Sequence, residues 1–342
     1  MSLFKSVWQN VPRGIAHRIT PSQSPTHLHA IFAAARSTPP PAAPSTPRTP
    51  PHRGSTRAFS ATPSRAKLPA VDDAYKRNTV HDLLSLKGKV TVVTGGGRGI
   101  GLALARGCVE VGGNVAVLDA LPIAHPDFEE MKKEFPESRI EYYQTNVADL
   151  PTLTKSFDSV VADFGRIDSC VTAAGIVLDK PFLEHGWDET LRVQMVNTMG
   201  TFFAAQLAAK QMVKQKTPGS IVMIASIAAH HAVPSQHLSG YSCSKGAVHA
   251  LMQQLAVELA PMQIRVNSVS PGYIFTDMTA GLGVQYPEIV ALFESEPPMK
   301  RMGDRCDLKT PVVHLLSDAA AYTTGSDLLI TGGLHLGYID ME

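Results

Sequence analysis

What this chain of 342 residues lacks already narrows its class. No window holds 18 or more uninterrupted apolar residues, so a membrane-spanning helix is not expected. Cysteine is scarce, and its four residues are widely spaced: Cys108, Cys170, Cys243 and Cys306. Because they form no C-x-x-C pair, the sequence offers no cysteine zinc site, and we expect free thiols in a reducing compartment.

Acidic residues are missing from the start of the chain. Residues 1–71 contain no Asp or Glu but nine Lys or Arg, and apolar residues recur at helical spacing from Leu3 to Ile15. An acid-free, Arg- and Ser-rich, amphipathic start is typical of a mitochondrial presequence, and residues 57–62 resemble a matrix-protease cleavage region. The Pro-rich stretch 37–51 reads as a disordered linker. We therefore expect 1–71 to direct the protein to the mitochondrial matrix; a disordered basic tail on a cytoplasmic protein is the alternative.

The rest of the chain, 72–342, has the composition of one folded domain. Without the basic segment it retains 22 basic and 30 acidic residues, a formal charge of −8. An acidic body of this kind argues against nucleic acid as a partner. No linker interrupts it, so one domain is favoured over two.

Short β-branched runs alternate with helical stretches along this domain. The expected strands cover 89–94, 114–119, 139–145, 167–173, 220–225, 265–269 and 328–331. The expected helices cover 101–111, 128–135, 153–164, 188–216 and 241–260. This alternation requires crossover connections and predicts a single α/β domain of the doubly wound Rossmann type, a parallel sheet with helices on both faces. In such folds the ligand lies beyond the carboxyl ends of the strands.

A glycine-rich turn separates the first expected strand from the first helix. Gly95, Gly99 and Gly101 have a spacing that allows the backbone to approach a pyrophosphate at a helix N-terminus. An ordinary tight turn is the alternative, but Asp119 follows at the end of the next strand, where its carboxylate can bind the adenosine ribose. That carboxylate would repel a 2′-phosphate, whereas Arg98 could attract one. We expect NAD as the cofactor, with NADP possible.

Tyr241 and Lys245 stand four residues apart at the start of an expected helix, so their side chains share one face. A phenol with a pKa of about 10 is a weak acid or base at neutral pH. A neighbouring ammonium favours the phenolate and would lower that pKa. The pair could therefore transfer protons, although a chance Tyr/Lys pair on an exposed helix has the same pattern.

Taken in order, these motifs resemble the short-chain dehydrogenase/reductase family over essentially all of 85–342. The resemblance extends to Asn197 in VNTMG, Ser226 in MIASIAA, and Pro271-Gly272 followed by Thr276. Ala173 stands where the family usually has Asn, and Thr331 replaces an Asp that commonly precedes the C-terminal Gly-Gly. Neither change removes a catalytic group.

The resemblance assigns roles to individual residues. It implies that Tyr241 is the general acid/base, that Lys245 lowers the tyrosine pKa and holds the nicotinamide ribose, that Ser226 binds the reacting oxygen, and that Asn197 positions a water. Hydride passes to or from the nicotinamide, and the protein supplies alignment. The residues expected to contact the cofactor are Gly95, Arg98, Gly99, Ile100, Gly101, Asp119, Asn146, Val147, Ala174, Gly175, Tyr241, Lys245, Pro271, Gly272, Ile274 and Thr276.

The substrate is indicated by the segment between Ser226 and Tyr241. Residues 227–240 contain His230, His231, Ser235, Gln236 and His237, and are similar to the fungal polyol and ketose branch of the family, most of all to arabinitol dehydrogenases. Hydrogen-bonding side chains there would suit a polyhydroxylated substrate, although an ordinary polar loop is the alternative. No metal site is expected, because the histidines have no carboxylate or cysteine at ligand spacing.

The expected reaction is therefore oxidation of a polyol, such as the pentitol D-arabinitol, to a ketose with NAD. NADPH-dependent reduction of a ketose such as sorbose or xylulose, or of a mitochondrial 3-oxoacyl thioester, is the alternative, and a catalytically inactive scaffold is disfavoured by the intact set of motifs. Residues 278–303 are expected to form a lid over the substrate, with Met278, Leu282, Leu292 and Phe293 as its core. The resemblance also implies a homotetramer formed through the helices over 188–216 and 241–260.

Overall fold

The computed structural model of the protein describes residues 73–233, 235–276, 279–280 and 287–337. These residues all belong to one compact unit. The expected presequence and linker lie outside the described residues, as do Met278 and Leu282 of the expected lid. Within the described part, no helix is both long and apolar enough to cross a bilayer.

Seven parallel strands form one sheet in the order β3-β2-β1-β4-β5-β6-β7. The strands are β1 (Val90–Thr94), β2 (Asn114–Asp119), β3 (Ile140–Gln144), β4 (Ser169–Thr172), β5 (Gly219–Ile224), β6 (Ile264–Pro271) and β7 (Asp327–Ile330). Each lies within about two residues of a run that the sequence predicts as a strand. The central strands are buried on both faces, which explains their unbroken β-branched and apolar sequences.

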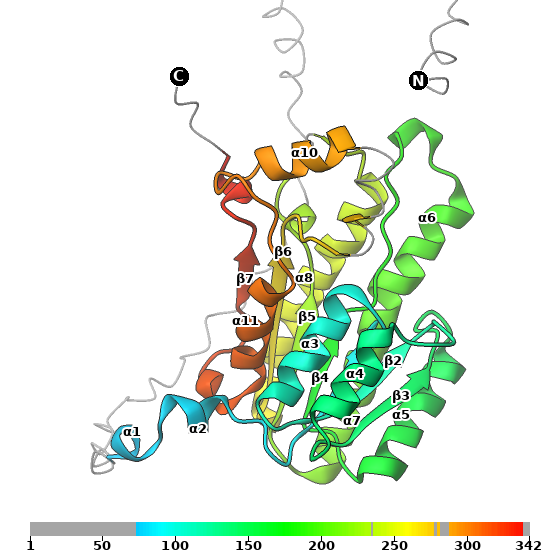
Figure 1. The fold of residues 1–342 in the computed structure, drawn as a ribbon. Coiled ribbons are helices and arrows are strands. Elements are labelled where there is room, and N and C mark those ends of the chain that lie inside the picture. The colour runs from blue at the N-terminus through cyan, green and yellow to red at the C-terminus, as the bar shows by residue number, and fades with distance from the viewer. Residues whose placement is uncertain (1–72, 234, 277–278, 281–286, 338–342) are drawn as a thin grey trace, which may run out of the picture. The chain divides into compact units, whose positions relative to one another are not determined.

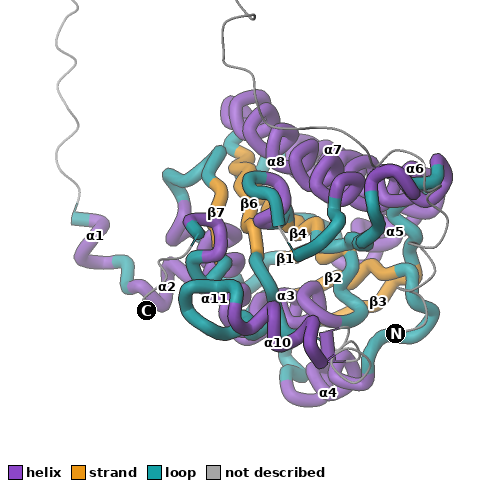
Figure 2. The backbone as a smooth tube through the Cα atoms, turned by 90° about the horizontal axis from the view of Figure 1, so that it is seen from above, coloured by secondary structure: helices purple, strands orange, loops and turns teal. Residues whose placement is uncertain are grey.

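Helices cover both faces of the sheet, as the view along it shows (Figure 2). One face packs against α3 (Gly99–Glu110), α4 (Pro126–Glu134) and α11 (Cys306–Leu316). The other packs against α5 (Leu150–Phe164), α7 (Gly200–Gln215) and α8 (Ser239–Leu259). This arrangement confirms the predicted single doubly wound α/β domain (Figure 1).

The helix predicted over 188–216 is divided. The structure has α6 (Trp187–Gln194), a π-helical turn η2 (Met195–Met199) and then α7. The turn inserts one residue into the helical repeat and carries the fully buried Asn197. Asn197 accepts a hydrogen bond from the Ile176 amide at 2.8 Å and donates to the Ile176 carbonyl at 2.9 Å. These backbone contacts fix the widened turn.

Several short elements were not predicted. They are α1 (Ala74–Arg77), α2 (Val80–Leu84) and α10 (Pro287–Ser295), and the 3-10 turns η1 (Phe182–Glu184), η3 (Ile227–Ala229), η4 (Ala260–Met262), η5 (Asp318–Ala320) and η6 (Leu334–Leu336). Helix α11 was also missed, because Pro311 interrupts its sequence pattern. Its buried Leu308 and Val312 nevertheless complete the core beneath α3.

Candidate active site

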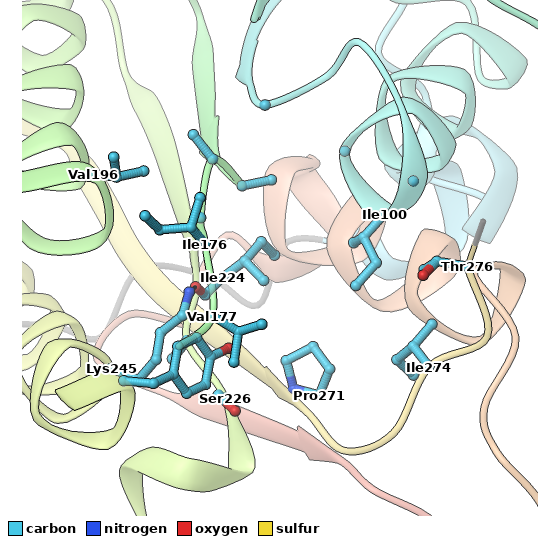
Figure 3. Close-up of a pocket in the computed structure, with 18 of the residues that line it drawn as sticks. Ile100, Ile176, Val177, Val196, Ile224, Ser226, Lys245, Pro271, Ile274 and Thr276 are labelled. Carbon is cyan, nitrogen blue, oxygen red and sulfur yellow. Dashed lines mark hydrogen bonds between the residues drawn. The ribbon is translucent and has the colours of Figure 1, made fainter. Parts of the chain in front are cut away.

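A cavity of about 860 Å³ lies where the parallel strands end. Its lining follows six strands in turn, from the glycine turn after β1 to the segment after β6. Figure 3 shows residues from distant parts of the chain around this space, with Ile100 and Thr276 on one side and Lys245 and Ser226 on the other. The location is the one expected for a ligand of a doubly wound sheet.

Every residue that the sequence predicts as a cofactor contact lines this cavity. They are Gly95, Arg98, Gly99, Ile100, Gly101, Asp119, Asn146, Val147, Ala174, Gly175, Tyr241, Lys245, Pro271, Gly272, Ile274 and Thr276. Their side chains and backbone therefore border one space large enough for an elongated ligand. Contact with the cofactor itself stays a prediction.

The turn between β1 and α3 requires glycine for steric reasons. Gly95 has a φ of +68°, and a Cβ there would lie 2.6 Å from the Ala174 backbone. A Cβ on Gly101 would lie 2.1 Å from the Gly95 carbonyl oxygen. The turn therefore folds back on itself and exposes backbone at the N-terminus of α3, where the helix dipole and free N–H groups favour an anion. This cradle fits the pyrophosphate of a nicotinamide dinucleotide.

Asp119 is held at the end of β2 by the same turn. Its Oδ2 accepts a hydrogen bond from the Gly97 amide at 2.9 Å, and its Oδ1 accepts one from the Leu121 amide at 3.0 Å. A Cβ on Gly97 would lie 2.8 Å from the Asp119 carboxyl carbon. The carboxylate is thus fixed against the cradle, while Arg98 is exposed at the cavity wall. Asp119 and Arg98, the two residues that bear on the choice between NAD and NADP, therefore line the same cavity.

Tyr241 and Ser226 both line the cavity, and the Ser226 side chain is near enough to the phenol to lower its pKa. Ser226 begins the turn after β5, where its Oγ also accepts a hydrogen bond from the Ala228 amide at 3.1 Å. Tyr241 lies in the first turn of α8. Two hydroxyls that face the cavity side by side can together bind one substrate oxygen and exchange a proton with it.

Lys245 lies one turn after Tyr241 and is buried, with 5% of its surface exposed. Its Nζ donates a hydrogen bond to the Ile224 carbonyl at 2.7 Å and lies 5.7 Å from the centre of the Tyr241 ring. Burial lowers the pKa of Lys245 to about 8, because a desolvated ammonium loses hydration. The Lys245 ammonium therefore loses its proton about one pH unit above neutrality.

Burial raises the pKa of Tyr241 above its ordinary value, and the interaction with the Ser226 side chain offsets that rise in part. The Lys245 ammonium donates to the Ile224 carbonyl. That Lys245 lowers the pKa of Tyr241 during catalysis stays a prediction.

Asn197 lies behind the cavity wall and is not among its described lining residues. Besides Ile176, it contacts the Ser244 hydroxyl at 3.0 Å. A Cβ on Gly175 would lie 3.5 Å from the Asn197 Oδ1 and 3.6 Å from the Lys245 Nζ. Asn197 and Lys245 therefore both approach the backbone segment after β4.

The loop over 227–240 contributes fewer polar groups to the cavity than the sequence suggests. Of its polar side chains, Gln236 lines the space, while His231 and His237 are exposed. Ser235 hydrogen-bonds to the Tyr273 hydroxyl at 2.9 Å and to the Glu296 carboxylate at 3.1 Å. The idea that these histidines bind substrate is not supported by their positions.

Sequence reasoning missed several lining residues, among them Tyr273, Arg192, Val177 and Val233. Tyr273 follows the recognised Pro-Gly pair, and its ring stacks on Phe293 of α10 with centroids 4.2 Å apart. Its hydroxyl donates to Glu296 at 2.6 Å. Phe293 is buried as predicted for the lid core, whereas Leu292 is exposed. The position of Tyr273 beside the Pro-Gly pair was the available signal.

Comparison with known proteins agrees with this geometry. A family model described as enoyl-(acyl carrier protein) reductase matches residues 95–335. The chain is 36% identical over 263 residues to the NADP-dependent mannitol dehydrogenase of Hypocrea jecorina, covering 75% of this chain and 96% of that protein. It is 30% identical over 261 residues to the ribulose-forming D-arabinitol 2-dehydrogenase of Candida tropicalis, covering 72% and 93%. The crystal structure of a short-chain type dehydrogenase/reductase from Mycobacterium marinum is 37% identical, with a TM-score of 0.69 over 75% of this chain and 99% of that one. The chain therefore belongs to the short-chain dehydrogenase/reductase family of oxidoreductases.

Proposed function

We propose that the protein is a polyol dehydrogenase that oxidises a secondary alcohol of a pentitol, such as D-arabinitol, to a ketone by hydride transfer to a nicotinamide cofactor. The observation that carries this proposal is that Tyr241, Ser226 and Lys245 line the same cavity as the glycine turn. The names of the mannitol and D-arabinitol relatives support a polyhydroxylated substrate. Gln236 and Tyr273 provide further hydrogen-bonding groups in the same cavity.

The roles of the residues follow from their positions. The glycine turn, Asp119 and Lys245 would hold a nicotinamide dinucleotide, which would supply the hydride acceptor for oxidation of the carbinol carbon. Ser226 holds the substrate hydroxyl, and Tyr241 as phenolate accepts its proton. Lys245 holds positive charge beside Tyr241 and is fixed by the Ile224 carbonyl. Asn197 fixes the backbone at Ile176, which is part of the cavity wall.

For the cofactor we propose NAD, with NADP as the alternative. Asp119 lies beside the cradle, where its charge opposes a 2′-phosphate. Arg98 and the similarity to an NADP-dependent mannitol dehydrogenase point the other way. The ratio of kcat/KM for NAD and NADP in one preparation decides between these opposing charges.

Initial rates of the purified protein test the proposal. The substrates are arabinitol, xylitol, mannitol, sorbitol and a hydrophobic secondary alcohol, each with NAD and with NADP. Rapid reduction of the cofactor with one pentitol is the expected result. Activity confined to reduction of a ketose with NADPH would reverse the proposed direction. Activity confined to a 3-oxoacyl thioester with NADPH would contradict the proposed substrate class.

We also propose that the protein acts in the mitochondrial matrix. The support is the acid-free, amphipathic sequence of residues 1–71. These residues fused to a fluorescent protein should direct it to mitochondria, and the same fusion with Arg13 and Arg18 changed to Glu should not. A cytoplasmic signal from the unchanged fusion would reject the proposal.

A further inference from the structure

Three side chains that are distant in sequence meet outside the catalytic cavity. His230 follows η3, His249 lies on α8 and Asp327 begins β7. One ligand atom from each lies within 4.8 Å of the other two, and among the residues that the structure describes no other His, Cys, Asp or Glu trio is grouped in this way. None of the three is among the described residues that line the cavity.

The spacing of these atoms fits a small divalent cation. The His230 Nε2 lies 2.8 Å and the His249 Nδ1 4.0 Å from the Asp327 Oδ2. Zinc binds His nitrogen and carboxylate oxygen at about 2.0–2.2 Å, so neighbouring ligand atoms of a tetrahedral site are roughly 3.3 Å apart. Changes of about 0.5 and 0.7 Å would bring these two distances to that value, and the ligand atoms of the two histidines lie within 4.8 Å of each other.

The carboxylate is held in place before any ion binds. Ser268 donates to the Asp327 Oδ1 at 2.5 Å, and Ser270 donates to its Oδ2 at 2.8 Å. Both serines are fully buried on β6, and the Asp327 side chain is only 7% exposed. Hydrogen bonds that orient a ligand in this way are a regular feature of metal sites. A nearly buried anion also gains from a compensating positive charge.

The imidazole of His249 provides the independent observation. Its Nδ1 is buried and has no hydrogen-bond partner among the described residues. A buried polar nitrogen without a partner is destabilising, and such groups call for an explanation. It lies 4.0 Å from the Asp327 Oδ2, too far for a hydrogen bond but on the correct side to share an ion with it.

We propose that His230, His249 and Asp327 bind a divalent transition-metal ion, with zinc the best match to two imidazoles and one carboxylate, and with a fourth position left for water. The ion would join the segment after Ser226, helix α8 four residues beyond Lys245, and the start of β7. It would therefore fix the two chain segments that carry the catalytic hydroxyls and the buried lysine, without contacting the substrate.

This site could not be expected from the sequence. His230 and His231 have no carboxylate or cysteine at ligand spacing, so the sequence predicts no metal site. In the structure, His249 rather than His231 lies beside His230. The third member of the group is Asp327, which is 97 residues after His230. The carboxylate is supplied by strand pairing between β6 and β7, which places Asp327 opposite Ser268.

The test is zinc binding by the full-length protein prepared without a histidine tag and treated with a chelator. Titration calorimetry and metal analysis after gel filtration give affinity and stoichiometry. The variants are His249→Gln and Asp327→Asn, and His231→Ala is the matched control, because His231 is exposed and adjacent to His230 but outside the trio. Retained dinucleotide binding and circular dichroism establish that each variant is folded. Zinc held by histidines elsewhere in the chain is common to every variant, so only the difference between His249→Gln and the control reports on the trio.

We expect one zinc per chain in the wild type and in His231→Ala. Zinc should bind more than about 100-fold more weakly to His249→Gln, since removal of groups that only orient a ligand already costs about 10–100-fold. Zinc should also raise the melting temperature of the wild type and not that of His249→Gln. Equal zinc affinity in the wild type and His249→Gln, or no measurable binding to the wild type, would overturn the proposal and leave His230 and Asp327 as an ordinary ion pair.

Discussion

At the scale of single residues, Lys245 combines a functional role with a cost in stability. Its pKa is about 8 in the folded protein and 10.5 in a solvated chain, a difference that corresponds to about 3 kcal/mol. Below pH 8 Lys245 is protonated in both the folded and the unfolded protein, and the buried charge destabilises the folded protein fully. Between pH 8 and 10.5 Lys245 is protonated only in the unfolded chain, so the free energy of unfolding rises with pH in that window.

Lys245→Met should therefore be as stable as the wild type at pH 7, or more stable by up to about 2 kcal/mol. The substitution removes the destabilising buried charge, and this gain equals or exceeds the loss of the hydrogen bond to the Ile224 carbonyl, which is worth about 1–3 kcal/mol. Turnover should fall by at least about 100-fold. Chemical denaturation at pH 7 and pH 10 measures the difference, which should shift in favour of the wild type at pH 10. A variant that loses stability at pH 7 and shows no such shift would contradict the buried charge.

Tyr241→Phe separates binding from chemistry. The ring remains and the hydroxyl that contacts Ser226 is lost, so affinity for the dinucleotide should change little while turnover falls by about 100- to 10,000-fold. Because Tyr241 must be deprotonated to accept a proton and burial raises its pKa, the wild-type oxidation rate should rise as pH is increased above 7. Cofactor fluorescence titration and steady-state rates measure the two quantities. Tyr142→Phe, whose hydroxyl donates to the Leu121 carbonyl, is the control. Wild-type turnover in Tyr241→Phe would remove Tyr241 from its catalytic role.

At the scale of elements, the turn between β1 and α3 depends on the absence of side chains. Gly101→Ala would place a Cβ 2.1 Å from the Gly95 carbonyl oxygen, so the cradle must open. We expect dinucleotide affinity to fall at least 10-fold, with a loss of stability. Gly246→Ala is the matched change, since a Cβ there meets nothing within 4 Å in the interior of α8 and should stabilise the helix by about 1 kcal/mol. Fluorescence titration and thermal melting of both variants test this; equal affinities would refute the close approach.

Some elements of the fold could be predicted from the sequence, and others could not. Strands and the glycine turn were predictable because their signals are local: β-branched runs, and glycines where a Cβ cannot fit. The π-helical turn at Asn197 was not, because it is fixed by the Ile176 backbone, 21 residues away. The His230–Asp327 contact was not predictable for the same reason, since it depends on which strand lies beside β6. Motif residues of the cofactor cavity were predictable, and the residues that surround the substrate were predictable only in part.

At the scale of the whole molecule, the face formed by α7 and α8 carries exposed apolar residues. Phe202 and Val213 on α7 are 39% and 46% exposed, and Val257 on α8 is 74% exposed. The two helices run side by side on the same face of the sheet (Figures 1 and 2). Apolar side chains that gather on a face are typical of an association surface. We propose that this face contributes to the homotetramer that the family resemblance implies.

Val257→Glu tests this surface. A carboxylate brought into an apolar interface between copies loses hydration without gaining a partner, so association should weaken by several kcal/mol. Light scattering after gel filtration should give the mass of four 36.7 kDa chains for the wild type and a smaller species for the variant at the same concentration. Val80→Glu, at a residue on α2 that is 69% exposed, should leave the mass unchanged. A wild type that elutes as one chain would reject association through this face. A variant with wild-type mass would place the contact elsewhere on the domain.

Because α8 also carries Tyr241 and Lys245, dissociation should reduce turnover along with mass, as the helix that positions both groups would lose its support.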